Sequence, residues 1–280
     1  MGGRPPGLPD FERPPVVEVV LSVQFEGLET LRTAHLGLLW AEFRDRFPKT
    51  EEQGPLLSVI ERFDRPSAPQ VGLRVETMFT PPVPRIWFLN ESGTELIQVQ
   101  TDRFIHNWRG TEKGAEYPRY ESVRESFHHE FEKFTSFVSR EKLGQLTINQ
   151  CEVTYVNHVV SGEGWTRHGE ISEIVSLWNS TARDAALPPL EDASLLARFV
   201  VLDAAGKPAG RLYVELQPAW RVVDSRPIYV LRLVARGRPQ GEGTEGALGF
   251  FDFGRKSIVE GFAAITTPRM QKIWRRIDDR

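Results

Sequence analysis

The sequence predicts an α+β fold in which two similar halves share one antiparallel sheet. Three observations lead to this prediction. Many short segments alternate apolar and polar residues, as strands with one buried face do. Two long stretches, 118–143 and 244–265, carry apolar residues at helical spacing. The order strand, helix, antiparallel strands, long helix occurs twice. We therefore expect a flexible arm over 1–14, a first α+β repeat over 15–144 and a second over 145–280, sharing one continuous sheet.

Composition places the chain among folded proteins of ordinary polarity. Of its 280 residues 40% are hydrophobic, 10% aromatic and 26% charged, and the formal net charge is −3. The single cysteine, Cys151, rules out an intramolecular disulfide and a Cys₄ or Cys₂His₂ zinc site. Apolar runs are too short to span a membrane, and the N-terminus has no apolar signal core. We expect a cytoplasmic bacterial protein without a cofactor or bound metal.

The elements of the first half follow from local patterns. Residues 16–25 alternate as a strand, with Val19 and Leu21 on its buried side. A helix is predicted over 33–47, capped by Thr33 and ended by Pro48. Strands are expected near 56–64, 71–79 and 85–90, followed by one long strand over 95–109. A second helix should run from Pro118 to Leu143.

The same order returns from residue 145. A strand is predicted over 146–160, then a short helix near 171–178 and strands near 194–203, 210–217 and 227–236. A long helix capped by Thr244 and a short helix beginning at Pro268 complete the chain. The best internal match sets Glu18 against Glu152, an offset of 134 residues. If a pseudo-dyad relates the halves, the first strand of each half would pair at the centre of the sheet.

Such a tandem unit has the layout of the TATA-box-binding-protein-like saddle and also of helix-grip folds. In both, a curved antiparallel sheet carries its helices on one side. The other face of such a sheet can stay open to water and to partners. This is an analogy of fold, which carries no chemistry by itself.

The predicted strand 95–109 carries the most informative pattern. One face would hold Ile97, Val99, Thr101 and Ile105, toward the helices. The other would combine amides, a carboxylate, an imidazole and aromatic rings, which suits recognition of a partner or ligand. Cross-strand pairing in an exposed sheet is the alternative. The candidate binding residues there, with Arg109 after them, are Gln98, Gln100, Asp102, Phe104, His106 and Trp108.

Three further polar residues are candidates on the central strands. If Glu18 and Glu152 approach each other across a pseudo-dyad, they could share a proton, hold a metal or pair with arginines; otherwise each is solvated or ion-paired separately. Asn157 falls on the face expected to be buried, where its amide needs partners. The pair His128 and Glu132, one helical turn apart, fits a solvated helix face better than a metal site because further ligands are missing. Cys151 is expected to be a buried strand residue.

The sequence contains no convincing phosphate-binding or catalytic motif. Gly241–Gly246 matches G-x-G-x-x-G by its letters but lacks the following strand that a dinucleotide site needs. No P-loop, nucleophile elbow or HExxH segment occurs. Residues 195–238 contain eight basic and three acidic residues, a local balance of +5. This segment could contact phosphates, or its charges could be dispersed over both faces of the sheet.

Four segments give a resemblance to a known family. They are Pro14-Pro15-Val-Val-Glu18, Gln98-x-Gln100-x-Asp102-Arg103-Phe104-x-x-Asn107-Trp108-Arg109, Tyr117-Pro118-x-Tyr120 and Glu152-Val-Thr-Tyr155-Val-Asn157. With them the chain resembles a sporadically distributed bacterial and archaeal family of about this length, without an established activity. The resemblance runs from Pro14 to the C-terminal helix and implies no catalytic residues. The sporadic distribution associates such proteins with accessory genes of defence or toxin–antitoxin modules.

Three hypotheses follow. The first is a non-enzymatic binding or regulatory protein whose polar–aromatic sheet face holds a protein partner or a small ligand. The second is an enzyme acting on a phosphorylated or nucleotide-like substrate through Glu18, Glu152 and Asp102, which requires these carboxylates to converge. The third is a nucleic-acid-binding regulator using the 195–238 arginines, which the net charge disfavours. Membrane binding is not expected, and homo-oligomerisation is left open.

Overall fold

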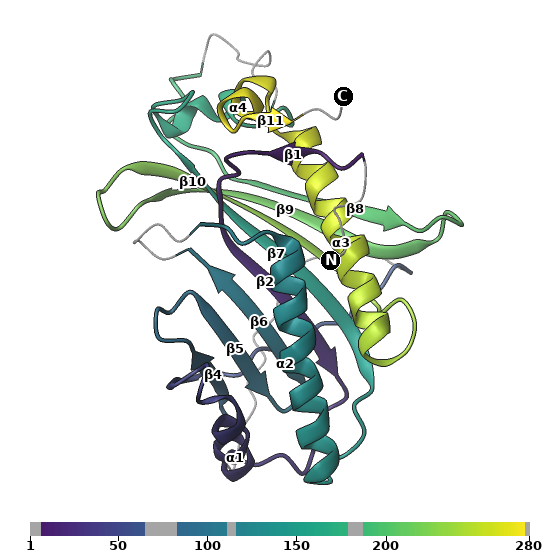
Figure 1. Cartoon of the computed structure of the whole chain (residues 1–280). Helices are drawn as coiled ribbons and strands as arrows, with labels where there is room; N and C mark the ends of the chain where they lie inside the picture. The colour runs from purple at the N-terminus through teal and green to yellow at the C-terminus, as the bar shows by residue number, and fades with distance from the viewer. Residues whose placement is uncertain (1–6, 65–82, 111–115, 179–186, 278–280) are drawn as a thin grey trace.

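A computed structural model of the chain describes residues 7–64, 83–110, 116–178 and 187–277. The described part is an α+β fold around a nine-stranded antiparallel sheet with the order β3-β4-β5-β6-β2-β7-β10-β9-β8. The two long helices, α2 (Tyr120–Arg140) and α3 (Gly243–Ile265), lie on the same face of this sheet (Figure 1). The strand expected at 71–79 lies outside the described residues. No helix in the described ranges is long and apolar enough to cross a membrane.

The first half of the chain builds one side of the sheet. Strand β2 (Val16–Phe25) leads to helix α1 (Thr33–Phe43), which packs beside β4. The short edge strand β3 (Lys49–Gln53), which the sequence patterns do not predict, pairs with β4 (Arg85–Leu89). Strands β5 (Glu95–Gln100) and β6 (Arg103–Arg109) then return the chain to β2, and α2 covers β6 and β2.

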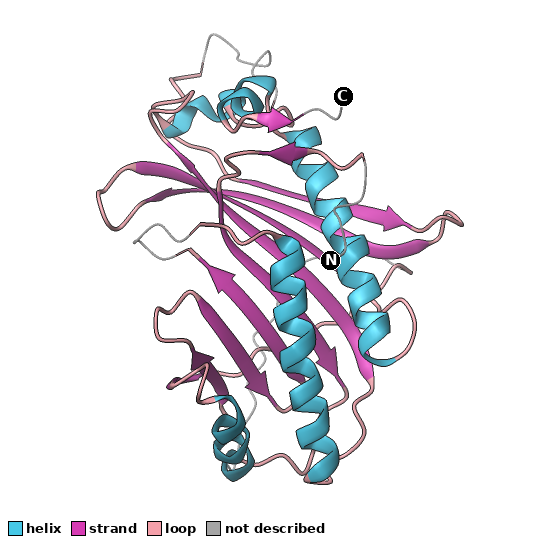
Figure 2. Ribbon diagram, in the orientation of Figure 1, coloured by secondary structure: helices cyan, strands magenta, loops and turns pink. Residues whose placement is uncertain are grey.

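The second half builds the other side in the same order. Strand β7 (Ile148–Val160) is followed by the short 3₁₀ helix η1 (His168–Glu173). Strands β8 (Leu195–Leu202), β9 (Pro208–Trp220) and β10 (Pro227–Gly237) form a meander that ends against β7. Helix α3 covers β7 and β10, and α4 (Pro268–Ile273) follows it. Figure 2 shows the sheet as a continuous twisted surface across both halves.

The first strands of the two halves, β2 and β7, pair antiparallel at the centre of the sheet. Val20 lies opposite Thr154, and these two residues are separated by the same offset of 134. Glu18 lies opposite Val156 and Ser22 opposite Glu152, so residues related by the offset fall symmetrically about the Val20–Thr154 pair. The register is therefore the one that a local pseudo-dyad through this pair requires. The common descent of the halves stays a prediction.

The core fills the space between the sheet and the two long helices. Helix α2 presents a stripe of phenylalanines because residues three and four apart share one helix face. The ring of Phe104 on β6 stacks on Phe134 with centroids 5.1 Å apart, and Phe127 meets Phe251 of α3 edge-on at 4.8 Å. Gly254 lets α3 approach the sheet, since a Cβ there would already lie 3.2 Å from side chains of β7 and β10.

The N-terminal arm is ordered earlier than its prolines suggest. Strand β1 (Asp10–Phe11) pairs with β11 (Arg276–Ile277), so the two ends of the described chain meet beside α4. The Phe11 ring packs edge-on against Phe262 and Trp274, at 5.3 and 6.4 Å. The prediction that the arm becomes ordered only near Pro14 was therefore wrong for residues 8–13, because the apolar burial of Phe11 offsets the entropy cost of ordering the arm.

Two predicted strands take another form. The stretch 95–109 is a hairpin, with a turn at Thr101 and Asp102, and not one strand. The stretch 56–64 forms no strand. Residues 54–63 instead run as an extended strap across the face of the sheet that the helices leave open, held there by side chains of the strands. Alternating residues alone do not separate a ladder strand from an extended segment bound by side chains.

Candidate functional site

The hairpin turn divides the candidate residues of 95–109 between the two faces of the sheet. Because two residues are used in the turn, Ile97 lies opposite His106, and Val99 opposite Phe104. Phe104, His106 and Trp108 therefore face the helices and are buried there, whereas Gln98 and Gln100 face the opposite side together with Ile105. The prediction of a single polar–aromatic face was wrong. It assumed one continuous strand, in which residues alternate between the faces without a break, whereas the turn shifts this alternation by one residue.

On the open face, Gln98 belongs to a chain of buried and partly buried hydrogen bonds. Its Nε2 donates to Asn107 Oδ1 at 2.7 Å, and Asn107 Nδ2 donates to Glu18 Oε1 at 2.8 Å. Trp87 Nε1 donates to Gln98 Oε1 at 2.9 Å. Arg109 stacks near the Trp87 ring at 5.8 Å and donates to a backbone carbonyl. These polar groups satisfy one another, and the sequence patterns do not single out Asn107 beyond the resemblance.

Glu18 and Glu152 do not converge. They occupy the same face, but Glu18 lies opposite Val156 and Glu152 lies opposite Ser22, four residues apart along the paired strands. At a rise of about 3.3 Å per residue this is roughly 13 Å. Glu18 binds Asn107, and Glu152 pairs with Arg236 at 2.5 Å. Asp102 lies at the β5–β6 turn and accepts from Gln100 at 2.5 Å. The shared acid/base or metal geometry that the second hypothesis requires is therefore not formed.

His106 belongs to a buried ionic cluster under α2. Its Nδ1 lies 2.6 Å from Glu130 Oε2, and Glu130 Oε1 lies 2.7 Å from Arg46 Nη1. His106 and Glu130 are almost fully buried, whereas Arg46 reaches solvent. No group of three His, Cys, Asp or Glu side chains within the described ranges could hold a metal ion. The cluster joins β6 to α2 and fixes their packing.

The other residues considered in the sequence have structural roles. His128 and Glu132 form an exposed ion pair at 3.3 Å on α2. Burial raises the pKa of the Cys151 thiol, as it does for an inert core cysteine. The 241–246 glycines form a tight loop, in which a Cβ at Gly246 would lie 2.3 Å from the carbonyl oxygen of Gly241. Arginines of the 195–238 segment pair with acidic residues at several places, among them Arg211, Arg221, Arg232 and Arg236.

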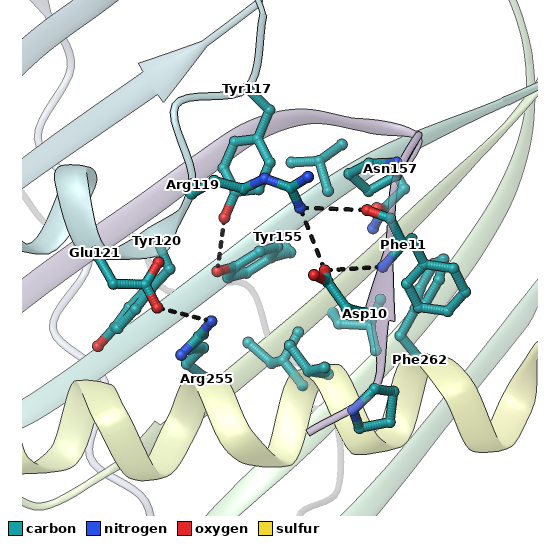
Figure 3. A pocket seen from close by; sticks show the side chains of 16 residues that line it. Asp10, Phe11, Tyr117, Arg119, Tyr120, Glu121, Tyr155, Asn157, Arg255 and Phe262 are labelled. Atoms are coloured by element: carbon teal, nitrogen blue, oxygen red, sulfur yellow. Dashed lines mark hydrogen bonds and ion pairs between the residues drawn. The ribbon is translucent and has the colours of Figure 1, made fainter. Parts of the chain in front are cut away.

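A cavity of about 340 Å³ lies between the sheet and α3, at the end of α2 (Figure 3). Its floor is formed by Tyr155 and Asn157 of β7 with Leu233 of β10, because residues i and i+2 of a strand share one face. One wall is the apolar side of α3, including Ile258, Val259 and Phe262. The segment before α2 contributes Tyr117 and Arg119, and the N-terminal arm, with Asp10 and Phe11, forms the side across from Glu121. This volume lies in the range of small-molecule pockets.

Two neutral phenols meet at the inner end of the cavity. The hydroxyl groups of Tyr117 and Tyr155 are 3.1 Å apart. Burial raises the pKa of Tyr155 to about 12 and also raises that of Tyr117 well above its ordinary value. The Trp108 ring lies 5.3 Å from the Tyr117 ring, which extends the aromatic wall toward β6. Both phenols therefore act as hydrogen-bonding groups near neutral pH and not as bases.

The charges around the cavity compensate one another. Arg255 Nη2 lies 3.1 Å from Glu121 Oε1, and the Arg255 guanidinium lies 4.7 Å from the centre of the Tyr120 ring. Arg119 Nη1 lies 3.3 Å from Asp10 Oδ1. Two basic and two acidic side chains thus leave the lining without net charge. Tyr120, Glu121 and Arg255 also line a larger outer groove between α2 and α3, so they separate the cavity from that groove.

Asn157 places a side-chain amide on the floor of the cavity. The side chain is 2% exposed, and its Nδ2 donates to the Leu231 carbonyl at 3.0 Å. Its Oδ1 accepts no hydrogen bond from the described residues, and Asn157 lines the cavity. The prediction that Asn157 lies on the buried face is confirmed. Its position on the cavity floor leaves an acceptor available to a bound molecule.

Sequence patterns alone missed most of this cavity. Arg255, Glu121 and Val259 lie on helices and show only helical periodicity in the sequence. Segments carrying the resemblance do meet here: Pro14, Tyr117, Tyr120, Tyr155 and Asn157 line the cavity, with Trp108 behind Tyr117. A scan against protein-family models and a search of curated proteins each find no match to this chain.

Proposed function

We propose that this protein is a non-enzymatic binding protein that holds a small, uncharged and largely apolar molecule in the cavity between α3 and the sheet. The observation that carries the proposal is the combination of a roughly 340 Å³ cavity with a polar acceptor on its floor, Asn157 Oδ1, which accepts no hydrogen bond from the described residues. Pockets with a mostly apolar lining and a few convergent polar groups are the usual sites of small ligands.

The lining supports the chemical class of the ligand. Apolar and aromatic walls favour burial of an apolar body. Compensated charges at Arg119–Asp10 and Arg255–Glu121 disfavour a ligand with net charge, since either sign would leave a buried ion without a partner. A hydrogen-bond donor on the ligand would satisfy Asn157 Oδ1. The proposed binding site is thus on the helix side of the sheet, and an accessory role in a defence module stays a prediction.

A fluorescent probe tests the proposal. N-phenyl-1-naphthylamine is neutral and aromatic, and its emission rises in apolar surroundings. We expect saturable 1:1 binding to the full chain, and at least a tenfold loss of affinity in Val259→Trp, whose indole would fill the cavity. The matched control is Glu260→Trp, because Glu260 is exposed on the same helix; it should bind as the wild type does.

Two outcomes would contradict the proposal. One is a wild-type protein that does not bind the probe, and the other is Val259→Trp binding as tightly as Glu260→Trp. Circular dichroism and thermal melting of both variants establish that each is folded before the comparison is made.

A further inference from the structure

The open face of the sheet carries a row of long polar side chains that runs across its strands. Gln100 lies opposite Arg103, Arg103 opposite Gln24, and Gln24 opposite Gln150, so four neighbouring strands each contribute one residue. A second row continues the line toward the other edge: Ser22 lies opposite Glu152, Glu152 opposite Arg236, and Arg236 opposite Arg211.

The strap, residues 54–63, lies along these rows, and the sheet binds its backbone. Gln100 Oε1 accepts from the Leu56 amide at 2.9 Å, and Gln100 Nε2 donates to the Leu56 carbonyl at 3.0 Å. Arg103 donates to the Leu57 carbonyl at 3.0 Å. Side-chain amides thus pair with a peptide backbone as a neighbouring strand would. Such contacts do not depend on the side chains of the bound segment.

The same pattern continues across the centre. The amide of Val59 donates to Gln24 Oε1 at 2.9 Å, and the amide of Glu61 donates to Gln150 Oε1 at 2.9 Å. From β5 to β7 the strap crosses three strand spacings of about 4.8 Å, roughly 14 Å. The five residue steps from Leu56 to Glu61 cover this distance, so the strap advances by nearly two residues per strand.

One side chain of the strap is recognised specifically. Glu61 is 5% exposed; its carboxylate accepts from Tyr213 Oη at 2.6 Å and pairs with Arg211 and, at 3.5 Å, with Arg236. Two apolar side chains of the strap are exposed instead: Leu57 is 87% exposed and Ile60 50%. Phe63 is half-buried, and its ring lies 5.0 Å from the Arg211 guanidinium, which gives the strap one aromatic contact with this face. Its attachment therefore combines backbone hydrogen bonds, one buried glutamate and this aromatic contact.

We propose that this face of the sheet is a groove for an extended peptide segment carrying a glutamate, and that the strap occupies it in cis. The partner is a protein segment in extended conformation. The first row of side chains binds its backbone, and Arg211, Arg236 and Tyr213 bind one carboxylate. Because the strap is tethered to the same chain, its effective concentration is of the order of millimolar, and it excludes a free peptide from the groove. Release of the strap opens the groove.

The test uses the full-length protein and a labelled peptide with the sequence from Gly54 to Asp64. Wild-type protein should bind this peptide at least tenfold more weakly than the variant Glu61→Ala, whose strap has lost its anchor. The control peptide carries glutamine in place of the glutamate and should bind the Glu61→Ala protein at least tenfold more weakly than the native peptide. Binding should also be lost when Arg211→Ala is added.

A second measurement keeps the proposal testable if Glu61→Ala is unstable. In wild-type protein, hydrogen exchange at the Val59 and Glu61 amides should be at least a hundredfold faster than at core amides such as Val153. Strap amides that exchange as slowly as the core would overturn the proposal, since the strap would then be a fixed part of the fold. A folded Glu61→Ala protein that binds neither peptide, or both equally, would overturn it as well. Neither result bears on binding in the cavity on the other face.

Discussion

The hydroxyl groups of Tyr117 and Tyr155 lie 3.1 Å apart at the inner end of the cavity, joining the segment before α2 to the central strand β7. Tyr155 is buried and Tyr117 closes over it, so neither phenol can release its proton without placing a charge in an apolar setting. This contact links the cavity floor to its wall. The ionisation of Tyr155 therefore reports on the integrity of the site.

The first prediction concerns alkaline pH. Burial raises the pKa of Tyr155 from 10.0 to about 12 in the folded state. The neutral phenol thus stabilises the fold in full below about pH 10, and this contribution is lost as the pH rises toward 12. Two pKa units correspond to about 2 to 3 kcal/mol. The free energy of unfolding should fall more steeply over this interval in wild type than in Tyr155→Phe, measured by urea denaturation; parallel curves would refute the account.

The second prediction concerns the cluster of His106, Glu130 and Arg46. Removing the carboxylate in Glu130→Ala leaves His106 buried without its partner at 2.6 Å. Breaking a buried pair in this way costs about 3 to 5 kcal/mol. Glu132→Ala on the same helix is the control, since Glu132 is exposed, and it should change stability by less than about 0.5 kcal/mol. Chemical denaturation gives both values, and equal effects of the two variants would show that the cluster does not hold α2 to the sheet.

The third prediction concerns selectivity at Asn157. A ligand hydroxyl can donate to Asn157 Oδ1, whereas a methoxy group in its place cannot. Wild-type protein should prefer 1-naphthol over 1-methoxynaphthalene by about tenfold, the equivalent of one hydrogen bond of about 1.4 kcal/mol. In Asn157→Leu both compounds should bind with similar affinity. Competition against N-phenyl-1-naphthylamine measures this preference, and a preference that survives the substitution would assign the hydrogen bond elsewhere.

Much of the fold could be predicted because its elements have clear periodic patterns. Strand β2 has the predicted limits, Val16–Phe25, since apolar residues alternate along it without interruption. The long helices were located to within a few residues by their apolar stripes. The pairing of β2 with β7 also agrees with the 134-residue offset between Glu18 and Glu152. These features depend on local sequence and on a symmetric arrangement.

The candidate site could not be predicted in the same way, because it depends on turns and on contacts between distant segments. The turn at Thr101 and Asp102 moves Trp108 and His106 to the helix side. The alternation of apolar and polar residues over 95–109 does not predict this turn. The cavity brings Asn157 together with Arg255, 98 residues away in sequence, through the packing of α3 on the sheet. The strap has the residue pattern of a strand, but its backbone binds glutamine side chains of the sheet and not the backbone of a neighbouring strand. The pattern alone does not distinguish these two cases.

The most direct test of the central claim locates a bound probe on the protein. In a methyl-labelled sample titrated with N-phenyl-1-naphthylamine, nuclear magnetic resonance follows Val and Ile methyl groups individually. The account predicts large shifts at Val16, Ile258 and Val259, which line the cavity, and none at the exposed Val200 of β8. Shifts confined to β8 or to the strap, with the cavity methyl groups unchanged, would contradict it.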